Sequence, residues 1–598
     1  MNTTTPLYAV SIYDREYTSW EFHYADLHNE IVSVPGVSPA THKLFSGDVF
    51  SMDTGVPVIV SSTIRKERLA GVLILDTGRT YGRLGRRLLY KCIPDDKSLP
   101  AFVIPYEIKA SFSKATKNKF IVFRFMEWGA GHPVGEIADT LGDVDDMNAF
   151  YEYQIWRNGL HININDFTKT VGRAIHAAGG EAAIIESILL NPNFVIEDHR
   201  HIDNVFSIDP STSTDYDDAF SVIYEDNGII RVNVYIANVF VWLEALGLWS
   251  TFAGRVSTIY LPDKKRPMLP GLLSDGACSL KEGYNRFAFM MTVVFDEYGK
   301  VVEEPSFKTV VIRVNKNYAY EEPALKKALS YRILHRLTEL LDSKIVDSHD
   351  VVAFWMIYMN HWAAVKLSGY GVGVFRGTTG ESAMKLPLSD QSELPSQYEA
   401  SLPSQSATSL PSQSATSLPF SADVMRVITA WSKDSAGSYA SYCGDIRSHA
   451  TLNLSAYTHI TSPIRRIVDL VNQMLFFKSA GFVKQFSEGS SAFLDKWTGS
   501  LELINKNVKL IRRTQMDCEL LQRCKDIDVV GKQFRGVIID YCEVDYGFYE
   551  YTVYLEELKL LAKVRSGDLV GVHSVATFSM FMFDDEDKLY KKVRLQMV

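Results

Sequence analysis

The chain has 598 residues, of which 46% are hydrophobic and 22% are charged, and its net charge is −9. This length is enough for about three to five domains, and the hydrophobic content allows each of them a full core. The negative charge argues against a surface that binds nucleic acid everywhere, although local basic clusters remain compatible with it. The composition therefore indicates a multidomain soluble protein and excludes a chain that is disordered throughout.

Cysteine usage and hydropathy indicate the cellular compartment of the protein. The six cysteines form no C-x-x-C pair, and no secretory segment precedes them, which predicts reduced thiols in an intracellular, cytoplasmic setting. The most apolar run, residues 351–365, contains Asn360 and His361 and is too short to span a bilayer. We interpret it as a buried helix and expect no membrane contact.

The N-terminal part has the pattern of small β-barrels. Alternating positions 7, 9 and 11, together with Phe45, Val49 and Phe50, permit a first barrel in residues 1–70. Further along, an arginine cluster lies beside Tyr81 and Tyr90. The members of this cluster are Arg79, Arg83, Arg86 and Arg87. Such a run either lines a path for nucleic acid or is a solvated face, and the sequence leaves both open.

The next elements form a strand, a loop and a hairpin. Residues 205–208 read as the end of a strand, and Pro210 with the Ser/Thr run after it indicates a loop. Residues 219–224 and 229–236 are β-branched and aromatic runs separated by an Asn-Gly turn signal at 225–228. A hairpin is therefore expected to brace the loop.

Four aspartates crowd into the ten residues of that loop and its borders: Asp209, Asp215, Asp217 and Asp218. Two carboxylates about 5 Å apart repel by roughly 3 kcal/mol at an effective dielectric near 20, so a cluster of four needs a cation. Because no His or Cys accompanies them, the oxygen ligands suit Mg²⁺ or Mn²⁺ better than Zn²⁺. A solvated acidic turn is the alternative, and an EF-hand Ca²⁺ loop does not fit from either Asp209 or Asp215.

A low-complexity segment interrupts the second half of the chain. An eight-residue repeat rich in Ser, Gln and Pro fills residues 393–419, and this composition buries too little apolar area to offset chain entropy. We therefore expect a disordered insertion at 389–421. Deleting residues 393–419 should leave the activity of the surrounding domain largely intact.

The sequence HITSPIRRIVDL begins at residue 459. Ser462 is a typical N-cap and Pro463 fits the first helical position, which predicts a helix from Pro463 onward. Arg465 and Arg466 would then lie in the first turn, where backbone N–H groups and guanidinium groups together favour a phosphate. The alternative is an exposed pair between Arg465 and Asp469.

Together these two motifs resemble those of the RNB-domain exoribonucleases, the family of ribonuclease II, ribonuclease R and the exosome nuclease. The family pattern is I-D-P, four residues, D-x-D-D-A and later T-S-P-I-R-R, and the chain reproduces both parts without a gap. Further matches between them, in the family's order, are Ser257–Pro262, Pro267–Pro270, Leu273–Ser274, Cys278–Leu280, Arg286 and Tyr320–Glu321.

The resemblance implies a multidomain α+β fold in which OB-type β-barrels flank a large mixed α/β RNB catalytic domain. The expected domains are a first cold-shock-like barrel at 1–70, a second at 71–150, a helical linker at 151–200, the RNB domain at 201–525 and an S1-like barrel at 526–598. It leaves no room before the first barrel for a PIN endonuclease domain, so no second active site is expected.

The resemblance also implies an activity, namely hydrolytic, processive 3′-to-5′ degradation of single-stranded RNA to nucleoside 5′-monophosphates. Asp209, Asp215 and Asp218 would hold Mg²⁺, for which Mn²⁺ is a substitute. Asp217 belongs to the same ligand set and is the position that the family assigns most directly to catalysis. Arg465 would bind the substrate phosphate.

The remaining site residues also follow from the resemblance. Arg466 would reach a neighbouring phosphate or hold its loop, Tyr260 would stack on or orient the terminal nucleotide, and Tyr320 would lie near it. The expected protein is a monomer that binds single-stranded RNA, with association with an RNA-decay complex left open.

The chain departs from the family pattern at Asn238 and Ile467, where the family has Asp and Tyr, and its late helix 505–521 offers no secure acidic match. One rival reading is a catalytically inactive RNA-binding or scaffold protein with the RNB fold. A second is a nuclease that cuts DNA or cuts internally.

Overall fold

The structure is a computed structural model of the chain. It describes residues 6–598 apart from 26–29, 53–54, 109–115, 226–227, 527–530, 546, 586–589 and most of 378–455, where it describes 424, 427–428, 431, 437–444 and 454. The predicted disordered insertion at 389–421 lies outside the described residues.

The first sheet has five strands in the order β3-β2-β1-β4-β5. Its strands are β1 (Leu7–Ile12), β2 (Trp20–Tyr24), β3 (Ile31–Val32), β4 (Val49–Ser51) and β5 (Val58–Ser61). In β1 the buried residues are Val10 and Ile12, which alternate with the positions 7, 9 and 11 noted in the sequence. They face inward with Phe22 and Phe50, which the pairing of β1 with β2 and β4 brings to the same side.

The second sheet has six strands in the order β6-β10-β11-β9-β8-β7, and β6 also pairs with β8, which closes a barrel. Its strands are β6 (Arg68–Leu73), β7 (Arg83–Leu84), β8 (Arg87–Pro94), β9 (Phe102–Tyr106), β10 (Lys119–Glu127) and β11 (Val134–Asp143). Alternate residues such as Cys92, Phe102, Ile121 and Phe123 fill its core, as expected for strands with one inward face.

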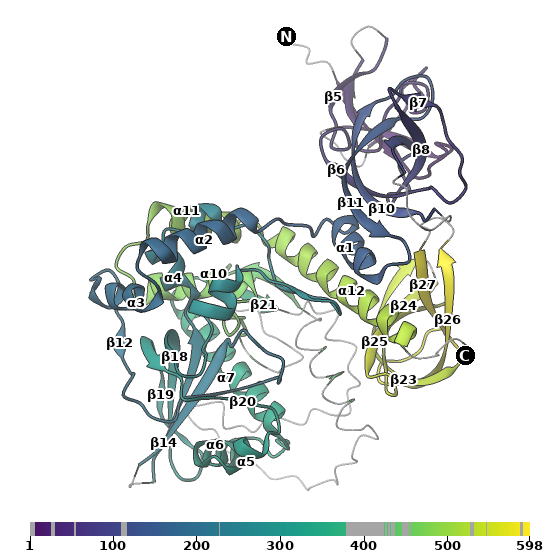
Figure 1. The fold of residues 1–598 in the computed structure, drawn as a ribbon. Coiled ribbons are helices and arrows are strands. Elements are labelled where there is room, and N and C mark those ends of the chain that lie inside the picture. The colour runs from purple at the N-terminus through teal and green to yellow at the C-terminus, as the bar shows by residue number, and fades with distance from the viewer. Residues whose placement is uncertain are drawn as a thin grey trace.

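The last sheet has five strands in the order β25-β24-β23-β26-β27. They are β23 (Gln533–Asp545), β24 (Phe548–Leu555), β25 (Leu560–Ser566), β26 (Val575–Asp585) and β27 (Tyr590–Met597). OB-type barrels therefore flank the larger central part of the chain, as the sequence predicted (Figure 1).

The central part is built on a seven-stranded sheet in the order β12-β19-β18-β15-β14-β13-β20. Its strands are β12 (Glu197–Asp198), β13 (Phe206–Asp209), β14 (Asp218–Tyr224), β15 (Ile230–Ala237), β18 (Asn285–Phe295), β19 (Val301–Arg313) and β20 (Lys316–Ala319). Two small two-stranded sheets accompany it: the hairpin of β16 (Ile259–Tyr260) with β17 (Lys265–Arg266), and the pair of β21 (Val374–Gly377) with β22 (Ser438–Ser441), which are distant in sequence.

Helices surround this sheet and connect it to the barrels. They are α1 (Met147–Arg157), α2 (Asn165–Ala177), α3 (Glu181–Leu190), α4 (Val239–Ala245), η1 (Trp249–Thr251), η2 (Leu272–Ala277), α5 (Pro323–Lys327), α6 (Leu329–Leu341), α7 (Ser348–Gly369), α10 (Ile467–Ser479), α11 (Glu488–Thr498) and α12 (Leu501–Asp526). The expected hairpin is β14–β15, and the expected buried helix is α7, which Asp347 caps by accepting from two backbone N–H groups.

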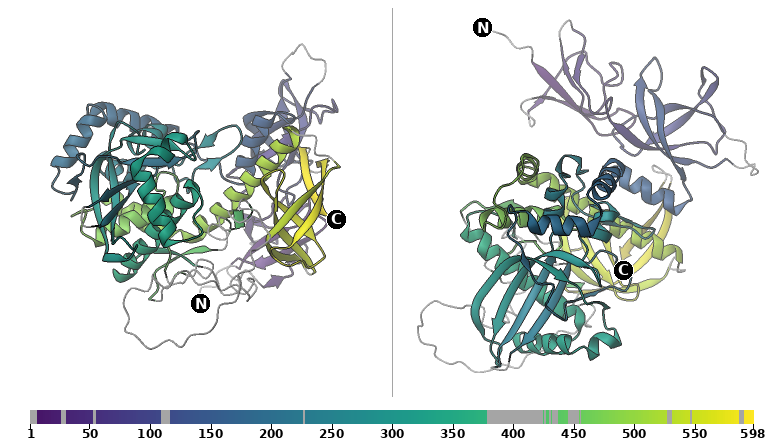
Figure 2. Two further views of the ribbon diagram at one scale, coloured as in Figure 1. Left: turned by 90° about the horizontal axis from the view of Figure 1, so that it is seen from below. Right: turned by 60° about the vertical axis from the view of Figure 1, so that its left-hand side comes forward.

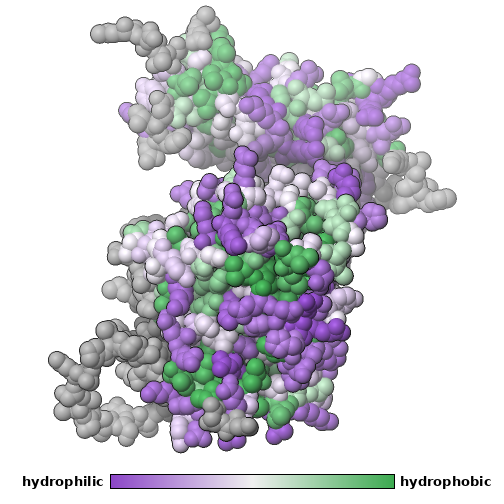
Figure 3. Space-filling model, turned by 90° about the vertical axis from the view of Figure 1, so that its left-hand side faces the viewer, coloured by the Kyte–Doolittle hydropathy of each residue, from purple (hydrophilic) through white to green (hydrophobic). Residues whose placement is uncertain are grey.

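The long helix α12 runs from the central part to the C-terminal barrel, and α1 packs beside it (Figures 1 and 2). Tyr151 of α1 bonds to Gln522, and Asn158 bonds to Thr514. None of the described helices has both the length and the apolar character that a bilayer-spanning segment needs. On the face shown in Figure 3, hydrophobic surface occurs as separate patches among hydrophilic residues.

Candidate active site

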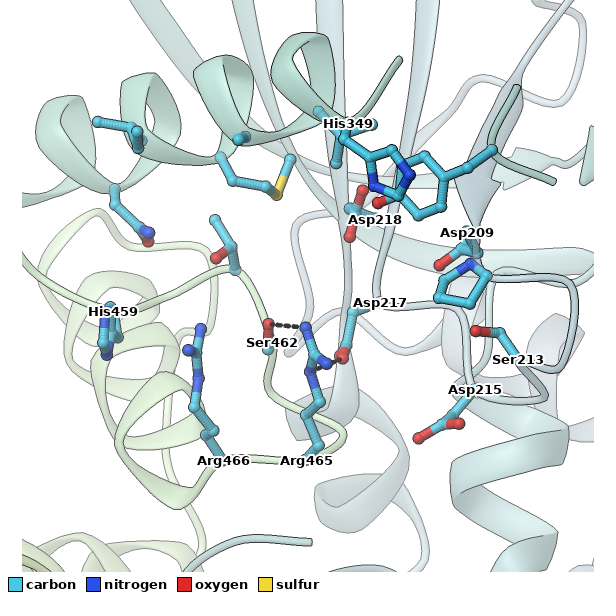
Figure 4. Close-up of a pocket in the computed structure, with 18 of the residues that line it drawn as sticks. Asp209, Ser213, Asp215, Asp217, Asp218, His349, His459, Ser462, Arg465 and Arg466 are labelled. Carbon is cyan, nitrogen blue, oxygen red and sulfur yellow. Dashed lines mark hydrogen bonds and ion pairs between the residues drawn. The ribbon is translucent and has the colours of Figure 1, made fainter. Parts of the chain in front are cut away.

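Two neighbouring strands bring the ends of the aspartate motif together. β13 ends at Asp209, β14 begins at Asp218, and the two strands pair antiparallel. The end of β13 and the start of β14 lie at the same end of these two strands, and the loop that connects them carries Asp215 and Asp217 (Figure 4). This topology explains why four carboxylates occur so close in sequence at this end of the strands.

Asp209 and Asp218 form the inner pair. The Oδ2 atom of each is buried and has no hydrogen-bond partner among the described residues. Burial, followed by the nearby carboxylates of Asp209 and Asp217, raises the pKa of Asp218 well above its usual value. Burial also raises the pKa of Asp209 to about 6, although a hydrogen bond from Ser207 opposes the shift. Two buried carboxylates with open oxygens fit a hard divalent cation, whose charge would remove their mutual repulsion.

Asp217 has a different environment and is only 3% exposed. Its Oδ1 accepts a hydrogen bond of 3.0 Å from the backbone N–H of Ile464, and its Oδ2 lies 3.2 Å from Nε of Arg465. Burial raises the pKa of Asp217 to about 7, while Arg465 and the Ile464 N–H group act in the opposite direction. Asp217 therefore joins the aspartate loop to the arginine segment.

The arginine segment is not the start of a helix, so that prediction is wrong. Helix α10 begins at Ile467, with Arg466 as its extended N-cap residue. The preceding residues form a tight turn in which the N–H groups of Arg465 and Arg466 donate to the carbonyl of Ser462. Tertiary contacts override the Ser-Pro capping signal, because Asp217 takes the N–H of Ile464 and residues 256–258 bond to the backbone on either side of Arg466.

The two arginines play separate parts in the structure. Arg466 binds Asp469 through two hydrogen bonds of 2.9 Å, so the expected Asp469 pair forms with Arg466 rather than with Arg465. Arg465 is 46% exposed at its side chain and uses Nε for Asp217 and Nη2 for Ser462. A guanidinium group has five N–H donors, so Arg465 keeps several for a ligand.

Asp215 does not join the inner pair. Its Oδ1 accepts from Nζ of Lys265 at 2.9 Å, and Figure 4 shows its side chain apart from Asp209 and Asp218. Among the described residues, no group of three or more His, Cys, Asp or Glu side chains is arranged to hold a metal ion. Of the four aspartates, Asp209 and Asp218 thus keep open oxygens, whereas Asp215 and Asp217 are ion-paired.

Aromatic side chains lie around the same cavity, which has a volume of about 1620 Å³. Tyr320 follows β20, and its N–H group donates to the carbonyl of Asp209, so the ring is fixed beside the inner pair. The ring stacks on His349 with centroids 3.7 Å apart and planes within 10°. Tyr260 lines the cavity from the β16–β17 hairpin and is 41% exposed.

Three of the residues around the site escaped the sequence prediction. His349 stacks on Tyr320, Ser462 bonds to Arg465, and Lys265 bonds to Asp215. Two of them had a signal in the sequence: Ser462 was the expected N-cap in the second motif, and Lys265 is the middle residue of a Lys-Lys-Arg run. His349 could not have been paired with Tyr320 in advance, because their contact depends on where α7 packs.

The comparison with known proteins identifies the domain that carries this site. A family model described as RNB domain matches residues 196–329 and 324–478. The chain contains an RNB domain. Its RNB domain carries the whole site described above, from Asp209 to Asp469. Among curated proteins, DIS3-like exonuclease 2 of Schizosaccharomyces pombe is 29% identical over 243 residues, which are 38% of this chain and 25% of that protein.

The similarity to curated proteins is partial in extent. The matched segments cover 25% to 46% of the first three curated relatives, so the chain matches less than half of the length of each. The fold is similar to that of Mycoplasma genitalium RNase R in complex with ribose-methylated single-stranded RNA, with a TM-score of 0.63, 16% identity and coverage of 99% of this chain and 100% of that one. It is also similar to yeast Ssd1, described as a pseudonuclease, with a TM-score of 0.55, 14% identity and coverage of 96% and 80%.

The two departures from the family pattern lie outside the cavity wall. Asn238 is buried and caps α4, where its side chain accepts from the N–H of Val241 at 3.2 Å. Ile467 is completely buried at the start of α10. Neither residue lines the cavity, so both changes lie away from the polar groups of the cavity wall.

Proposed function

We propose that this RNB-domain protein is a Mg²⁺-dependent hydrolase that removes nucleotides processively from the 3′ end of single-stranded RNA and releases nucleoside 5′-monophosphates. The observation that carries the proposal is the pair of buried, unsatisfied Oδ2 atoms of Asp209 and Asp218 in the same cavity as Arg465. A cation site and an anion site that face one cavity suit a phosphodiester substrate.

Asp209 and Asp218 would hold the cation, with Mn²⁺ as a substitute for Mg²⁺. When bound, it would activate a water and offset charge on the phosphate. Asp215 and Asp217 already have cationic partners, so they contribute less to binding a metal than the inner pair does.

Arg465 would bind the phosphate next to the scissile bond. Asp217 holds its Nε and Ser462 holds one terminal nitrogen, so the guanidinium plane is oriented before the substrate arrives. Preorganised donors of this kind stabilise charge that develops on phosphate oxygens without reorganisation during the reaction. Arg466 is occupied by Asp469 and would support the loop rather than bind phosphate.

Tyr260 and the Tyr320–His349 stack would bind nucleobases at the end of the cavity near the carboxylates. Stacking on an aromatic face contributes roughly 1–3 kcal/mol for any base, which suits an enzyme that acts on RNA of any sequence.

The arginine hairpin β7–β8 of the second barrel would contact RNA outside the cavity. Arg79, Arg83, Arg86 and Arg87 are all exposed, and in the described part of the chain none of them forms an ion pair with a carboxylate. Tyr81 is 43% exposed beside His132 at the same hairpin. This combination of exposed cations and an aromatic ring supports phosphate and base contacts.

We also propose types for the three barrels. The first two barrels would be of the cold-shock type, and the last one of the S1 type.

All six cysteines are free thiols, which supports a reducing, cytoplasmic location. We also propose that the protein acts as a monomer that associates with RNA-decay factors.

The second candidate function is an inactive RNA-binding protein with the same fold, which the similarity to a pseudonuclease favours. The presence of all four aspartates and of Arg465 opposes it. A side-by-side assay with Mg²⁺ on linear RNA, circular RNA and linear DNA separates the candidates. Our proposal expects shortening of linear RNA alone. Cleavage of circular RNA would instead indicate an endonuclease, and binding of RNA without any cleavage would indicate the inactive protein.

A further inference from the structure

We propose that Lys265 is a positioning residue that holds Asp215 away from Asp209 and Asp218, so that the site binds one divalent cation through the inner pair. This inference rests on the proposed function, because it concerns the same cation site. It assigns a role to a lysine that the motif comparison leaves out and removes Asp215 from the metal ligands.

The contacts of the Lys265 ammonium group are the first argument. Nζ lies 2.9 Å from Oδ1 of Asp215, 2.8 Å from Oδ1 of Asp275 and 2.6 Å from Oγ1 of Thr214. An ammonium group has three N–H donors, so these three acceptors use all of them. Oδ1 of Asp215 is thus held by an ammonium group whose donors are all used.

The backbone on which Lys265 sits is rigid. Lys265 pairs with Tyr260 across the β16–β17 hairpin. The neighbouring residue Arg266 is held by two carboxylate side chains. The Arg266 guanidinium binds both carboxylate oxygens of Asp263 at 2.8 Å and one oxygen of Glu152 at 2.8 Å, and this side chain is 8% exposed. The ammonium group therefore has a fixed position from which to hold Asp215.

The segment that carries Asp215 is held on its other side as well. The N–H group of Tyr216 donates to Oγ of Ser279 at 2.9 Å, and the N–H group of Leu280 donates to the carbonyl of Tyr216 at 2.9 Å. The third acceptor of Lys265, Asp275, is fixed by a 2.8 Å bond from Ser274. Residues 214–216 are thus hydrogen-bonded to residues 274–280, and the Lys265 side chain adds a further link between Asp215 and Asp275.

The charge balance of the site explains why the position of Lys265 matters. Four carboxylates at one edge of the sheet would repel each other and would also repel the phosphate of a substrate. Arg465 pairs with Asp217, and Lys265 pairs with Asp215 and with Asp275. Among the described residues, the inner pair is therefore the part of the four-aspartate set without a cationic partner, and its own charge of about −2 matches one divalent cation. Lys265 thereby does for Asp215 what a second metal ion would otherwise have to do.

The test is the binding of Mn²⁺ alone to the full chain without RNA, measured from the loss of the free Mn²⁺ electron paramagnetic resonance signal. The wild type should bind one ion. Asp215→Asn should change the affinity by less than about twofold, whereas Lys265→Met should release Asp215 toward the inner pair and tighten binding about tenfold. The double variant with both changes should return to the wild-type affinity.

Lys264→Met is the matched control, because Lys264 lies on the same hairpin but pairs with Glu152 at 3.2 Å, and it should bind Mn²⁺ as the wild type does. Weakening of tenfold or more in Asp215→Asn would show that Asp215 is a ligand and would overturn the inference. So would wild-type affinity in Lys265→Met, or a gain that persists in the double variant.

Asp218→Asn separates this inference from the proposed function. If it binds Mn²⁺ as tightly as the wild type, the proposed cation site fails and the role of Lys265 fails with it. If it abolishes binding while Asp215→Asn weakens binding tenfold, only the role of Lys265 fails.

Discussion

The two pairs of aspartates at the edge of the central sheet have the same chemistry but different surroundings. Asp209 and Asp218 end and begin paired strands, and each keeps a buried oxygen without a partner among the described residues. Asp215 and Asp217, in the loop between them, each have a cationic partner. The comparison teaches that a cluster of carboxylates in a sequence does not define a ligand set, because nearby lysines and arginines divide it into open and occupied groups.

The largest expected difference between the pairs is in catalysis. Asp218→Asn removes one of the two open carboxylates and should lower the rate of RNA degradation about 10³-fold or more, since several kcal/mol of charge stabilisation depend on the cation. Asp215→Asn, the matched change in the occupied pair, should lower it less than tenfold. Rates for both variants under saturating Mg²⁺ check this difference, and equal losses would remove the distinction between the pairs.

Substitution of Arg465 tests whether this partner of Asp217 also acts on the substrate. Arg465→Ala should lower the rate about 10²- to 10³-fold, the range for loss of one preorganised donor. Arg465→Lys should recover only part of that loss, because an ammonium group cannot keep both the Asp217 contact and a forked phosphate contact. Single-turnover kinetics on a short RNA distinguish these variants, and full activity in Arg465→Ala would exclude the phosphate role.

Without metal, loss of the Asp209 carboxylate should change stability in the direction opposite to its effect on activity. The pKa of Asp209 is raised from 3.8 to about 6 in the folded protein, so its contribution to stability is present below pH 4 and is lost as the pH rises through 6. Asp209→Asn should therefore stabilise the metal-free protein by up to about 3 kcal/mol at pH 7.5. The gain should shrink toward zero near pH 4.

Thermal unfolding measured between pH 4 and 7.5, with and without Mg²⁺, checks this prediction. Mg²⁺ should raise the melting temperature of the wild type, because an ion that binds the folded state stabilises it. It should do so much less in Asp209→Asn. A gain from the substitution that is the same at every pH would show that the carboxylate charge is not its cause.

The smallest expected effect lies far from both pairs, at the β7–β8 hairpin. Changing both Arg83 and Arg87 to Ala should weaken the binding of a long single-stranded RNA several-fold and reduce the salt dependence by about 0.7 per lost contact. Degradation of an RNA short enough to fill only the cavity should stay unchanged. Fluorescence anisotropy at several salt concentrations measures the slope, and an unchanged slope would assign the hairpin to a solvated face.

Much of this architecture could be predicted from the sequence, because it depends on local patterns. The β14–β15 hairpin and helix α7 follow from runs of residues whose periodicity and turn signals agree with the fold. The two motifs line one cavity, as the resemblance implied, but the direct contact of Asp217 with Arg465 was not predicted.

Other features depend on contacts between distant segments, which local patterns do not contain. Helix α10 starts four residues later than Ser462 and Pro463 suggest, because Asp217 and residues 256–258 take the backbone groups of that turn. The inward face of β1 could not be assigned from its alternation alone for a similar reason, since its partners β2 and β4 determine which side is buried. Lys265 was visible as a basic residue, but its partner Asp215 lies 50 positions away.

The measurement that tests the central claim most directly is the fate of a 3′-labelled single-stranded RNA incubated with the full chain and Mg²⁺, beside Asp217→Asn. The account predicts that the label leaves as a nucleoside 5′-monophosphate with the wild type and stays in the RNA with the variant. Intact RNA with both proteins, or equal release by both, would contradict it.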